Sequence, residues 1–416
     1  MNLPRLHEKY LQTRAAGSRW SPQGMVRSDF AAVVVIPALA ERFSLPETLR
    51  SLAENPRQDL EQTLVIVIVN NRKSAPAIVQ SENRDTLEWL RSKPFPGLNL
   101  AWIDAASTGY ELPEGEGVGL ARKIGFDAGL CLLDWSGDPL LISLDADTLV
   151  DRAYLPAIFR HFAQSAYGGC AIPFRHQPLA DPHGEDAIRD YELYLRSYLF
   201  GLQAAGSPYA YHTIGSAFAC RAAAYLAAGG MNRRLAAEDF YFLQQLAKCS
   251  GVELLQGTCV QPSPRFSERV PFGTGQVVRS RIEEQTRNYR FVAVQGFRLL
   301  QSWLMLVAAG WDRPAADIGR QAAKLSPELA AFLDSLNFPR VWQRLQDNHR
   351  TREQRVAAFH CWFDALRTRQ LLTRGDVPVE QTPERLVAEL LSWGGHPGAD
   401  DKEAQLHLLE RLQGVV

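Results

Sequence analysis

Uninterrupted apolar runs alternate with amphipathic stretches along the first third of the chain. The apolar runs are rich in β-branched residues and cover 31–38, 63–71, 98–105 and the segment that begins at 139. The stretches between them have the periodicity of helices and cover 45–55, 81–93 and 117–135. Strands that are apolar on both faces and alternate with helices indicate parallel pairing, so we predict an α/β fold with a doubly wound, mostly parallel sheet.

The pattern changes after about residue 276. Three later segments have the apolar spacing of amphipathic helices, and no strand alternation accompanies them: 277–300, 326–346 and 351–372. We therefore predict an N-terminal extension at 1–30, an α/β domain at 31–275 and a helical C-terminal domain at 276–416.

Composition and charge narrow the classes of partner. The chain has 416 residues, 46% of them hydrophobic, and a formal net charge of -1, so no general basic field is present to hold nucleic acid. The six cysteines have no metal-binding spacing, and the N-terminus lacks the apolar core of a signal peptide, so we expect a cytoplasmic protein. The apolar segment 299–311 is shorter than the roughly 20 residues that span a bilayer, and leaves peripheral membrane contact open.

The fourth apolar run ends in two carboxylates, Asp145 and Asp147. Residues at i and i+2 of a strand point to the same side, so both could reach one ion. Two carboxylates suit Mg²⁺ or Mn²⁺ and leave positions for phosphate oxygens of a departing nucleoside diphosphate. The plain alternative is an acidic exit from a strand, in which Asp147 or Thr148 caps a helix expected at 151–162.

A phosphatase is a second alternative. The segment "LISLDADTLV" fits the first motif of haloacid-dehalogenase-type phosphatases, with Asp145 as nucleophile and Asp147 as acid/base. That class also needs a later lysine and an acidic pair, but the first lysine after the motif is Lys248, and no acidic pair ending an apolar strand follows it. Three strand–helix units also precede the motif, whereas this class usually opens with it.

Four segments together resemble glycosyltransferase family 2 and its GT-A relatives. They are "VVVIPALAE" at 33–41, "GEGVGLARKIGFDAG" at 115–129, the strand that ends in the aspartate pair, and 214–248, which contains Gly215, Ser216, Arg221, Tyr225, Gly229, Gly230, Glu238 and Asp239. The resemblance covers 31–275 and implies a GT-A-like catalytic domain. It implies a metal-dependent hexosyltransferase-type enzyme that moves a sugar from a nucleoside-diphosphate sugar to a hydroxyl of a sugar, lipid or small-molecule acceptor. A non-catalytic nucleotide-sugar-binding or scaffold protein of the same shape remains open.

The resemblance also assigns roles to single residues. Asp239 is the candidate base, with Glu238 beside it, and implies inversion at the anomeric carbon. The alternative is that these acids only complement a helix dipole. The candidate nucleotide-binding residues are Pro37, Ala38, Glu41, Asn70, Gly119, Arg122, Lys123 and Asp145, and the candidate metal ligands are Asp145 and Asp147.

Two departures from the family pattern stand out. The second strand ends in Asn70 and Asn71 where the family commonly has an acidic pair, and no Gln-Arg-Trp motif follows Asp239. The chain instead has a segment at 262–275, in which we interpret Arg265, Glu268, Arg269 and 271–275 as a mobile loop whose arginines grip phosphate or an acidic acceptor; the alternative is a rigid connector into the helical domain. Candidates for an extra metal ligand are His161, His176, His183 and His212.

Overall fold

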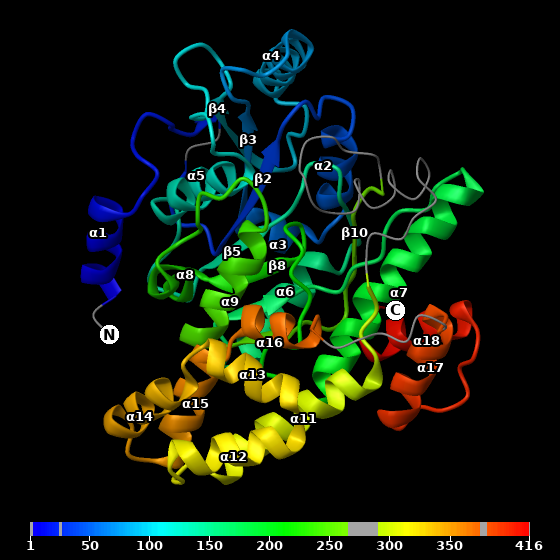
Figure 1. Cartoon of the computed structure of the whole chain (residues 1–416). Helices are drawn as coiled ribbons and strands as arrows, with labels where there is room; N and C mark the ends of the chain where they lie inside the picture. The colour runs from blue at the N-terminus through cyan, green and yellow to red at the C-terminus, as the bar shows by residue number, and fades with distance from the viewer. Residues whose placement is uncertain (1–2, 25–26, 265–289, 375–380, 416) are drawn as a thin grey trace. The chain divides into compact units, whose positions relative to one another are not determined.

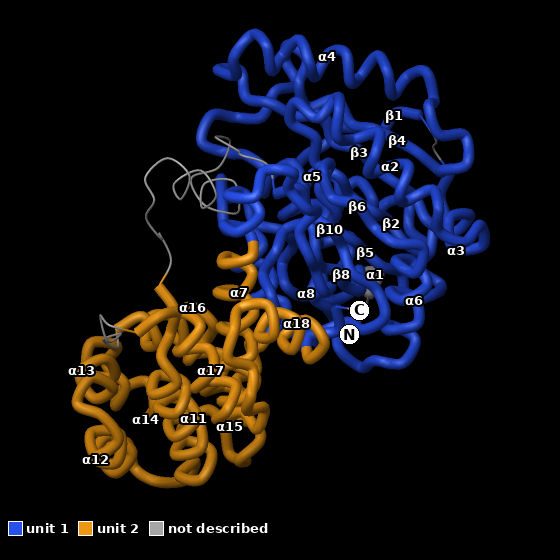
Figure 2. Tube along the Cα trace, turned by 90° about the vertical axis from the view of Figure 1, so that its right-hand side faces the viewer, with its two compact units in different colours: residues 1–188, 211–285, 413–416 blue, residues 189–210, 286–412 orange. Residues whose placement is uncertain are grey.

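The computed structural model describes residues 3–24, 27–264, 290–374 and 381–415 (Figure 1). The chain forms two compact units (Figure 2). Unit 1 comprises Met1–Ile188, Tyr211–Gln285 and Gln413–Val416, and unit 2 comprises Arg189–Ala210 and Thr286–Leu412. Residues 189–210 therefore belong with the C-terminal helices, which the sequence pattern did not indicate.

Unit 1 is built on an eight-stranded sheet with the order β1-β4-β3-β2-β5-β8-β7-β9. The strands are β1 (Gln23–Gly24), β2 (Ala32–Ala38), β3 (Thr63–Asn70), β4 (Asn99–Ala105), β5 (Leu140–Ser143), β7 (Gly169–Ala171), β8 (Phe218–Arg221) and β9 (Val252–Leu254). A separate antiparallel pair joins β6 (Leu149–Val150) to β10 (Val260–Gln261). The predicted α/β fold with a mostly parallel sheet is confirmed.

The order of the central strands creates a switch point. β4, β3, β2 and β5 are parallel, and the chain moves outward from β2 to β3 and β4 before it returns to β5 on the other side of β2. β8 runs antiparallel to β5. Open α/β sheets bind ligands beyond the carboxyl ends of the strands at such a switch point, which here lies between β2 and β5.

Helices connect and cover these strands. Those of unit 1 are α1 (Leu3–Thr13), α2 (Leu45–Ala53), α3 (Arg57–Glu61), α4 (Ala77–Arg91), α5 (Val118–Leu130), α6 (Tyr154–Gln164), α8 (Ala222–Ala228) and α9 (Glu238–Ser250). α5 packs against β2 and β3 and connects the parallel strands β4 and β5. Because it starts where β4 ends, its N-terminal turn lies near the carboxyl ends of the parallel strands. α7 (Pro182–Ala204) begins in unit 1 and continues into unit 2.

All the regular elements among the described residues of unit 2 are helices, as predicted for the C-terminal part of the chain. It contains most of α7 and α11 (Val294–Ala309), α12 (Ala315–Leu325), α13 (Pro327–Ser335), α14 (Phe338–Asn348), α15 (Arg352–Trp362), α16 (Ala365–Leu372), α17 (Pro383–Trp393) and α18 (Lys402–Leu412). Its core is aromatic: the fully buried ring of Trp303 packs edge-on against Phe338, Phe359 and Phe363.

Two helices that the sequence predicted as continuous are each split in two. The segment 326–346 breaks at Asn337, whose φ of 51° is left-handed, and the next helix begins at Phe338 with Pro339 in its first turn. The segment 351–372 breaks at Asp364, whose side chain caps α16 by accepting from the Arg367 N–H. Of the helix predicted at 277–300, the part before residue 290 lies outside the described residues, and α11 begins at Val294. In the part of the chain that the structure describes, no helix combines the length and apolarity that crossing a membrane requires.

Candidate active site

The aspartate pair follows β5 at the switch point of the sheet. The Leu144 N–H donates to the Val35 carbonyl at 3.1 Å, so pairing with β2 continues to the residue before Asp145. The turn that carries the pair is held from α2, because the Thr48 hydroxyl donates to the Ala146 carbonyl at 2.9 Å. Asp145 and Asp147 are both partly exposed there, which leaves them accessible to a ligand.

Arg122, on the first turns of α5, joins the aspartate pair to α9. Its guanidinium is only 2% exposed and makes ion pairs with both Asp145 and Glu238. Its Nε donates to the Ser143 hydroxyl at 3.1 Å, and that hydroxyl donates to the Gly215 carbonyl at 2.6 Å. One buried cation therefore holds the end of β5, the loop before β8 and the start of α9 together.

Two glycines allow this close assembly. A Cβ at Gly215 would overlap the Arg122 guanidinium, and a Cβ at Gly119 would lie 2.6 Å from the Arg234 carbonyl and 3.0 Å from the Glu238 Cβ. The sequence predicted that Gly119 lets the backbone approach a nucleotide. In the structure its missing side chain instead lets α5 pack against the segment that leads into α9.

Asp239 lies beside Glu238 in the first turn of α9. Its Oδ1 accepts from the Phe240 N–H at 2.7 Å. Burial and the neighbouring Glu238 charge raise the pKa of Asp239 to about 7, against the opposing effect of Arg122. Burial also raises the pKa of Glu238, again opposed by Arg122. A carboxylate that titrates near neutral pH is well matched to accept a proton from a hydroxyl.

Four of the candidate nucleotide-binding residues lie at or just beyond the ends of β2 and β3. Pro37 and Ala38 are buried in the last two positions of β2, and Glu41 is buried just beyond them. Asn70 ends β3 and is 5% exposed, and its side-chain Oδ1 has no hydrogen-bond partner among the described residues. A buried amide oxygen without a partner is costly, which favours a ligand donor at this position.

Asn83 on α4 supports these residues, and the sequence gave no signal for it beyond its place in a predicted helix. Its Nδ2 donates to the Asn70 carbonyl at 3.0 Å and to the Asn71 Oδ1 at 2.7 Å. Its Oδ1 accepts from the Ala40 N–H at 2.8 Å, where the backbone has a left-handed φ of 52°. The Asn71 side chain therefore has a partner within the fold, whereas the buried Asn70 Oδ1 has none among the described residues.

The structure does not bring Lys123 together with the other candidates. Its buried amine donates to the Tyr10 hydroxyl at 2.6 Å and lies 3.1 Å from an Asp127 carboxylate oxygen. Tyr10 comes from α1, so the lysine that the sequence placed near a diphosphate anchors the N-terminal helix instead. Burial lowers the pKa of Lys123, and the Asp127 charge opposes that effect.

The donor set at the sheet edge fits a cation that also binds phosphate. Asp145 and Asp147 offer carboxylate oxygens, and the 34% exposure of the Asp145 side chain leaves room for other ligands. Among the residues that the structure describes, no three His, Cys, Asp or Glu side chains form a metal cluster. The candidate histidines have other neighbours: His161 lies 3.9 Å from Glu253, and His212 lies 3.2 Å from the Gln413 side chain.

His176 and His183 are the two further candidate metal ligands. His176 packs edge-on against Phe174, and His183 lies in the first turn of α7. The segment with Arg265, Glu268, Arg269 and 271–275 lies outside the described residues. The candidate site therefore consists of the ends of β2, β3 and β5, the first turns of α5 and the start of α9.

The chain is similar in structure to glycosyltransferases whose structures are solved. No family model matches the chain, and no curated protein matches it. The Staphylococcus aureus TarS fragment 1–349 in complex with UDP-GlcNAc is similar at a TM-score of 0.40 and 13% identity, over 92% of each chain. The mannosyltransferase PcManGT from Pyrobaculum calidifontis, in complex with GDP-Man and Mn²⁺, is similar at a TM-score of 0.37 and 16% identity, over 87% of this chain and 93% of that one.

Proposed function

We propose that the chain is a glycosyltransferase that uses a nucleoside-diphosphate sugar. The observation that carries this proposal is the buried Arg122, which pairs with Asp145 after β5 and with Glu238 at the start of α9. Two acidic pairs, far apart in the sequence, thereby share one edge of a parallel sheet at its switch point. One pair suits a cation–diphosphate complex, and the other suits a base that activates a hydroxyl.

Each group has a separate task in this proposal. The ends of β2 and β3, with Glu41 and Asn70, contact the nucleoside, and the Asn70 Oδ1 accepts a hydrogen bond from it. The acceptor hydroxyl attacks the anomeric carbon while Asp239 takes its proton. The bond between the anomeric carbon and the diphosphate oxygen breaks, and its electron pair leaves with the diphosphate. Attack from the opposite face inverts the configuration of the sugar.

A divalent cation is part of the proposal. Asp145 and Asp147 would hold Mg²⁺ or Mn²⁺, which neutralises charge on the diphosphate. Arg122 already pairs with Asp145 in the fold, so the divalent metal ion would share the Asp145 carboxylate with the guanidinium. The chain itself supplies the position of that carboxylate, through the β2–β5 pairing and the Ser143–Gly215 hydrogen bond.

The first test is a thermal-shift screen of UDP-, GDP- and other nucleotide sugars, each with and without Mn²⁺. We expect one donor class to raise the melting temperature, and the shift to be larger with Mn²⁺. Asp147→Ala should remove the Mn²⁺-dependent part of that shift and abolish donor hydrolysis or transfer. A screen in which no nucleotide sugar stabilises the protein would refute the proposal.

The second test separates binding from chemistry. Asp239→Asn should keep nucleotide binding and lower the transfer rate by about 10²–10⁴-fold, because the variant cannot accept the proton. Asp85→Asn, at an exposed position of α4, is the matched control and should keep the wild-type rate. A wild-type rate in Asp239→Asn would exclude Asp239 as the base.

Turnover of a phosphate ester through a phospho-aspartyl adduct on Asp145, without any sugar nucleotide, would support a phosphatase instead. Donor binding without turnover across a broad acceptor panel would favour a binding protein.

A further inference from the structure

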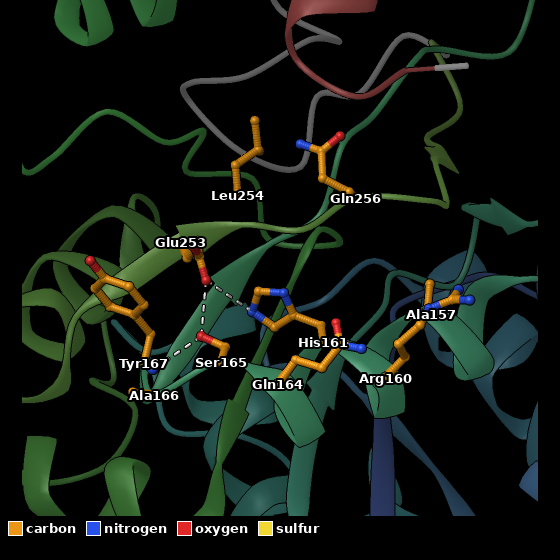
Figure 3. Close-up of a pocket in the computed structure, with 10 residues that line it drawn as sticks. All are labelled: Ala157, Arg160, His161, Gln164, Ser165, Ala166, Tyr167, Glu253, Leu254 and Gln256. Carbon is orange, nitrogen blue, oxygen red and sulfur yellow. Dashed lines mark hydrogen bonds and ion pairs between the residues drawn. The ribbon is translucent and has the colours of Figure 1, made fainter.

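A surface pocket of about 480 Å³ lies between the C-terminal part of α6 and the edge strand β9 (Figure 3). This volume falls within the range of about 300–1,000 Å³ that is usual for small-molecule sites. β8 and β7 lie between β9 and β5 in the sheet, so the pocket is separate from the candidate active site. All of its lining residues belong to unit 1.

Polar side chains of different chemistry converge in this pocket. The Ser165 hydroxyl donates to a Glu253 carboxylate oxygen at 2.9 Å, and the His161 Nε2 lies 3.9 Å from the same oxygen (Figure 3). The His161 Nε2 is buried and has no hydrogen-bond partner among the described residues. Burial lowers the pKa of His161, so its imidazole is neutral at neutral pH and can donate or accept one further bond. The exposed Arg160 and Gln256 also line the pocket.

An aromatic ring lies beside these polar groups. The side chain of Tyr167 is 46% exposed, and Figure 3 shows it on the side of the pocket away from Arg160. Tyr rings combine an apolar face with a polar hydroxyl. A sugar ring has the complementary surface, because one face presents C–H groups and the edge presents hydroxyls that both donate and accept.

The wall of the pocket is held rigid from outside it. Arg221 donates to the carbonyls of Phe162 at 2.8 Å, of Ser165 at 2.6 Å and of Tyr167 at 3.1 Å, and it also pairs with Asp138. Three hydrogen bonds from one guanidinium fix the turn that carries Ser165 and Tyr167. A pocket that is already formed binds a small ligand without first losing conformational entropy.

We propose that this pocket binds one neutral glycosyl unit at a place separate from the catalytic edge, independently of the glycosyltransferase function proposed above. The positive charge of Arg160 offsets the negative charge of Glu253, and the neutral His161 adds none, so the pocket favours a neutral polyhydroxyl ligand over a phosphate.

The test measures binding without any donor. Methyl glycosides of glucose, galactose, mannose and N-acetylglucosamine are titrated into the full chain and followed by saturation-transfer NMR, with inorganic phosphate as a separate probe. At least one glycoside should bind. Glu253→Ala and Tyr167→Ala should each weaken that binding by about tenfold or more, because each removes a direct contact. Glu61→Ala, at an exposed carboxylate on α3, is the matched control and should change nothing.

The outcomes separate this proposal from the proposed function. Glycoside binding that is lost in Asp239→Asn and kept in Glu253→Ala would place the sugar at the catalytic edge and overturn the proposal. Binding of phosphate and of no glycoside would overturn it as well. Nucleotide-sugar thermal shifts are measured on the same samples, so a failure of donor binding, which refutes the glycosyltransferase, is distinguishable from a failure of glycoside binding.

Discussion

Gly215 leaves open the space that the guanidinium of Arg122 occupies, since a Cβ at position 215 would overlap one of its Nη atoms. That guanidinium holds Asp145 and Glu238, so one missing side chain keeps two acidic pairs in place. We expect Gly215→Ala to displace Arg122, to lower the free energy of unfolding by about 1–3 kcal/mol as overpacking does, and to reduce transfer at least about tenfold.

Urea unfolding and a transfer assay measure these two effects. The matched control is Gly319→Ala on α12, where a Cβ would meet no atom within 4 Å. Alanine there should raise stability by about 0.5–1 kcal/mol, because it is the better helix former. If Gly215→Ala behaved like this control, the packing of Gly215 against Arg122 would not matter for the site.

The pKa of Asp239 predicts how transfer depends on pH. Burial and the charge of Glu238 raise that pKa to about 7, so the proposed base is protonated in acid. The value of kcat/KM should therefore rise with pH between about 5.5 and about 8.5, with its midpoint near neutral pH. A profile of kcat/KM that is flat across this window in the wild type would contradict the role of Asp239 as base.

The same shift predicts how Asp239 affects stability. A carboxyl whose pKa is higher in the folded chain than its ordinary value of 3.8 costs nothing below that value, and its cost grows as the pH rises toward about 7. Asp239→Asn should therefore stabilise the fold at pH 8 by up to about 4 kcal/mol and much less at pH 4, since the pKa rises from 3.8 to about 7 and each pKa unit corresponds to about 1.4 kcal/mol. Chemical denaturation at the two pH values measures the difference. Equal stabilisation at both would show that the carboxyl is not shifted.

The sequence predicted the strands that form the centre of the sheet. β2, β3 and β4 match the apolar runs to within a residue or two, because strands covered on both faces need continuous β-branched side chains. The later strands β7, β8 and β9 have only three or four residues each, too few for a period to be recognised. The helix breaks at Asn337 and Asp364 depend on local backbone angles, which a pattern of apolar positions does not contain.

The residues of the candidate site could be named from the sequence, but the ion pairs and hydrogen bonds that join them could not. The strand-end position of Asp145 and the helix-start position of Asp239 both followed from local pattern. The ion pairs of Arg122 with two carboxylates depend on the side-chain direction that tertiary packing sets. The neighbouring Lys123 points into a different cluster, because adjacent residues of a helix face different directions. The sequence alone does not show that Arg122 and Lys123 have different partners.

That second cluster anchors α1, the helix of the N-terminal extension. The Tyr10 hydroxyl donates to an Asp127 carboxylate oxygen at 2.7 Å and accepts from the Lys123 amine at 2.6 Å. Tyr10→Phe removes both bonds and leaves buried polar groups short of a partner, which should lower the free energy of unfolding by about 1–3 kcal/mol. Urea unfolding followed by tryptophan fluorescence tests this. Tyr110→Phe, at a residue that is 47% exposed, is the control, and an equally small effect in both variants would mean that the hydrogen bonds of the Tyr10 hydroxyl add nothing to stability.

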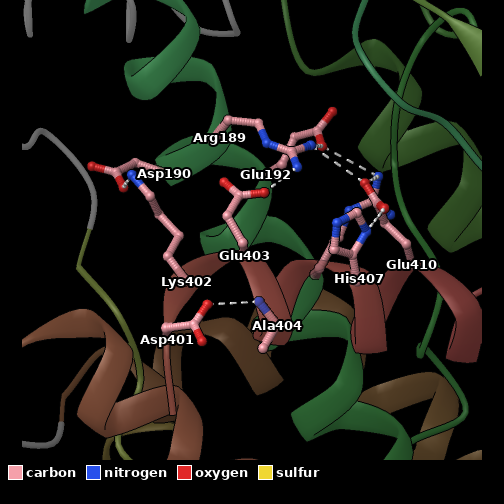
Figure 4. Close-up of polar contacts among 10 residues, drawn as sticks. Arg189, Asp190, Glu192, Asp401, Lys402, Glu403, Ala404, His407 and Glu410 are labelled. Carbon is pink, nitrogen blue, oxygen red and sulfur yellow. Dashed lines mark hydrogen bonds and ion pairs between the residues drawn. The ribbon is translucent and has the colours of Figure 1, made fainter. Parts of the chain in front are cut away.

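In unit 2 a buried ion network joins α7 to α18 (Figure 4). Arg196 is fully buried, and its Nη2 lies 3.5 Å from a Glu192 carboxylate oxygen and 4.0 Å from one of Glu410. Arg196→Met nearly keeps the side-chain volume but removes one of the two cations, the other being Arg189, that compensate the buried Glu192 and Glu410 carboxylates, so we expect a loss of up to about 3–5 kcal/mol in the free energy of unfolding. Arg57→Met on α3 is the control: the Arg57 side chain is 91% exposed and pairs with Glu61, so its loss should cost less than about 1 kcal/mol. Replacing Glu192 and Glu410 by leucine together with Arg196→Met should restore most of the loss, since no unpaired charge then remains at this position. Urea unfolding of the three variants decides the matter: if Arg196→Met cost no more than Arg57→Met, the network would contribute nothing to the attachment of α18.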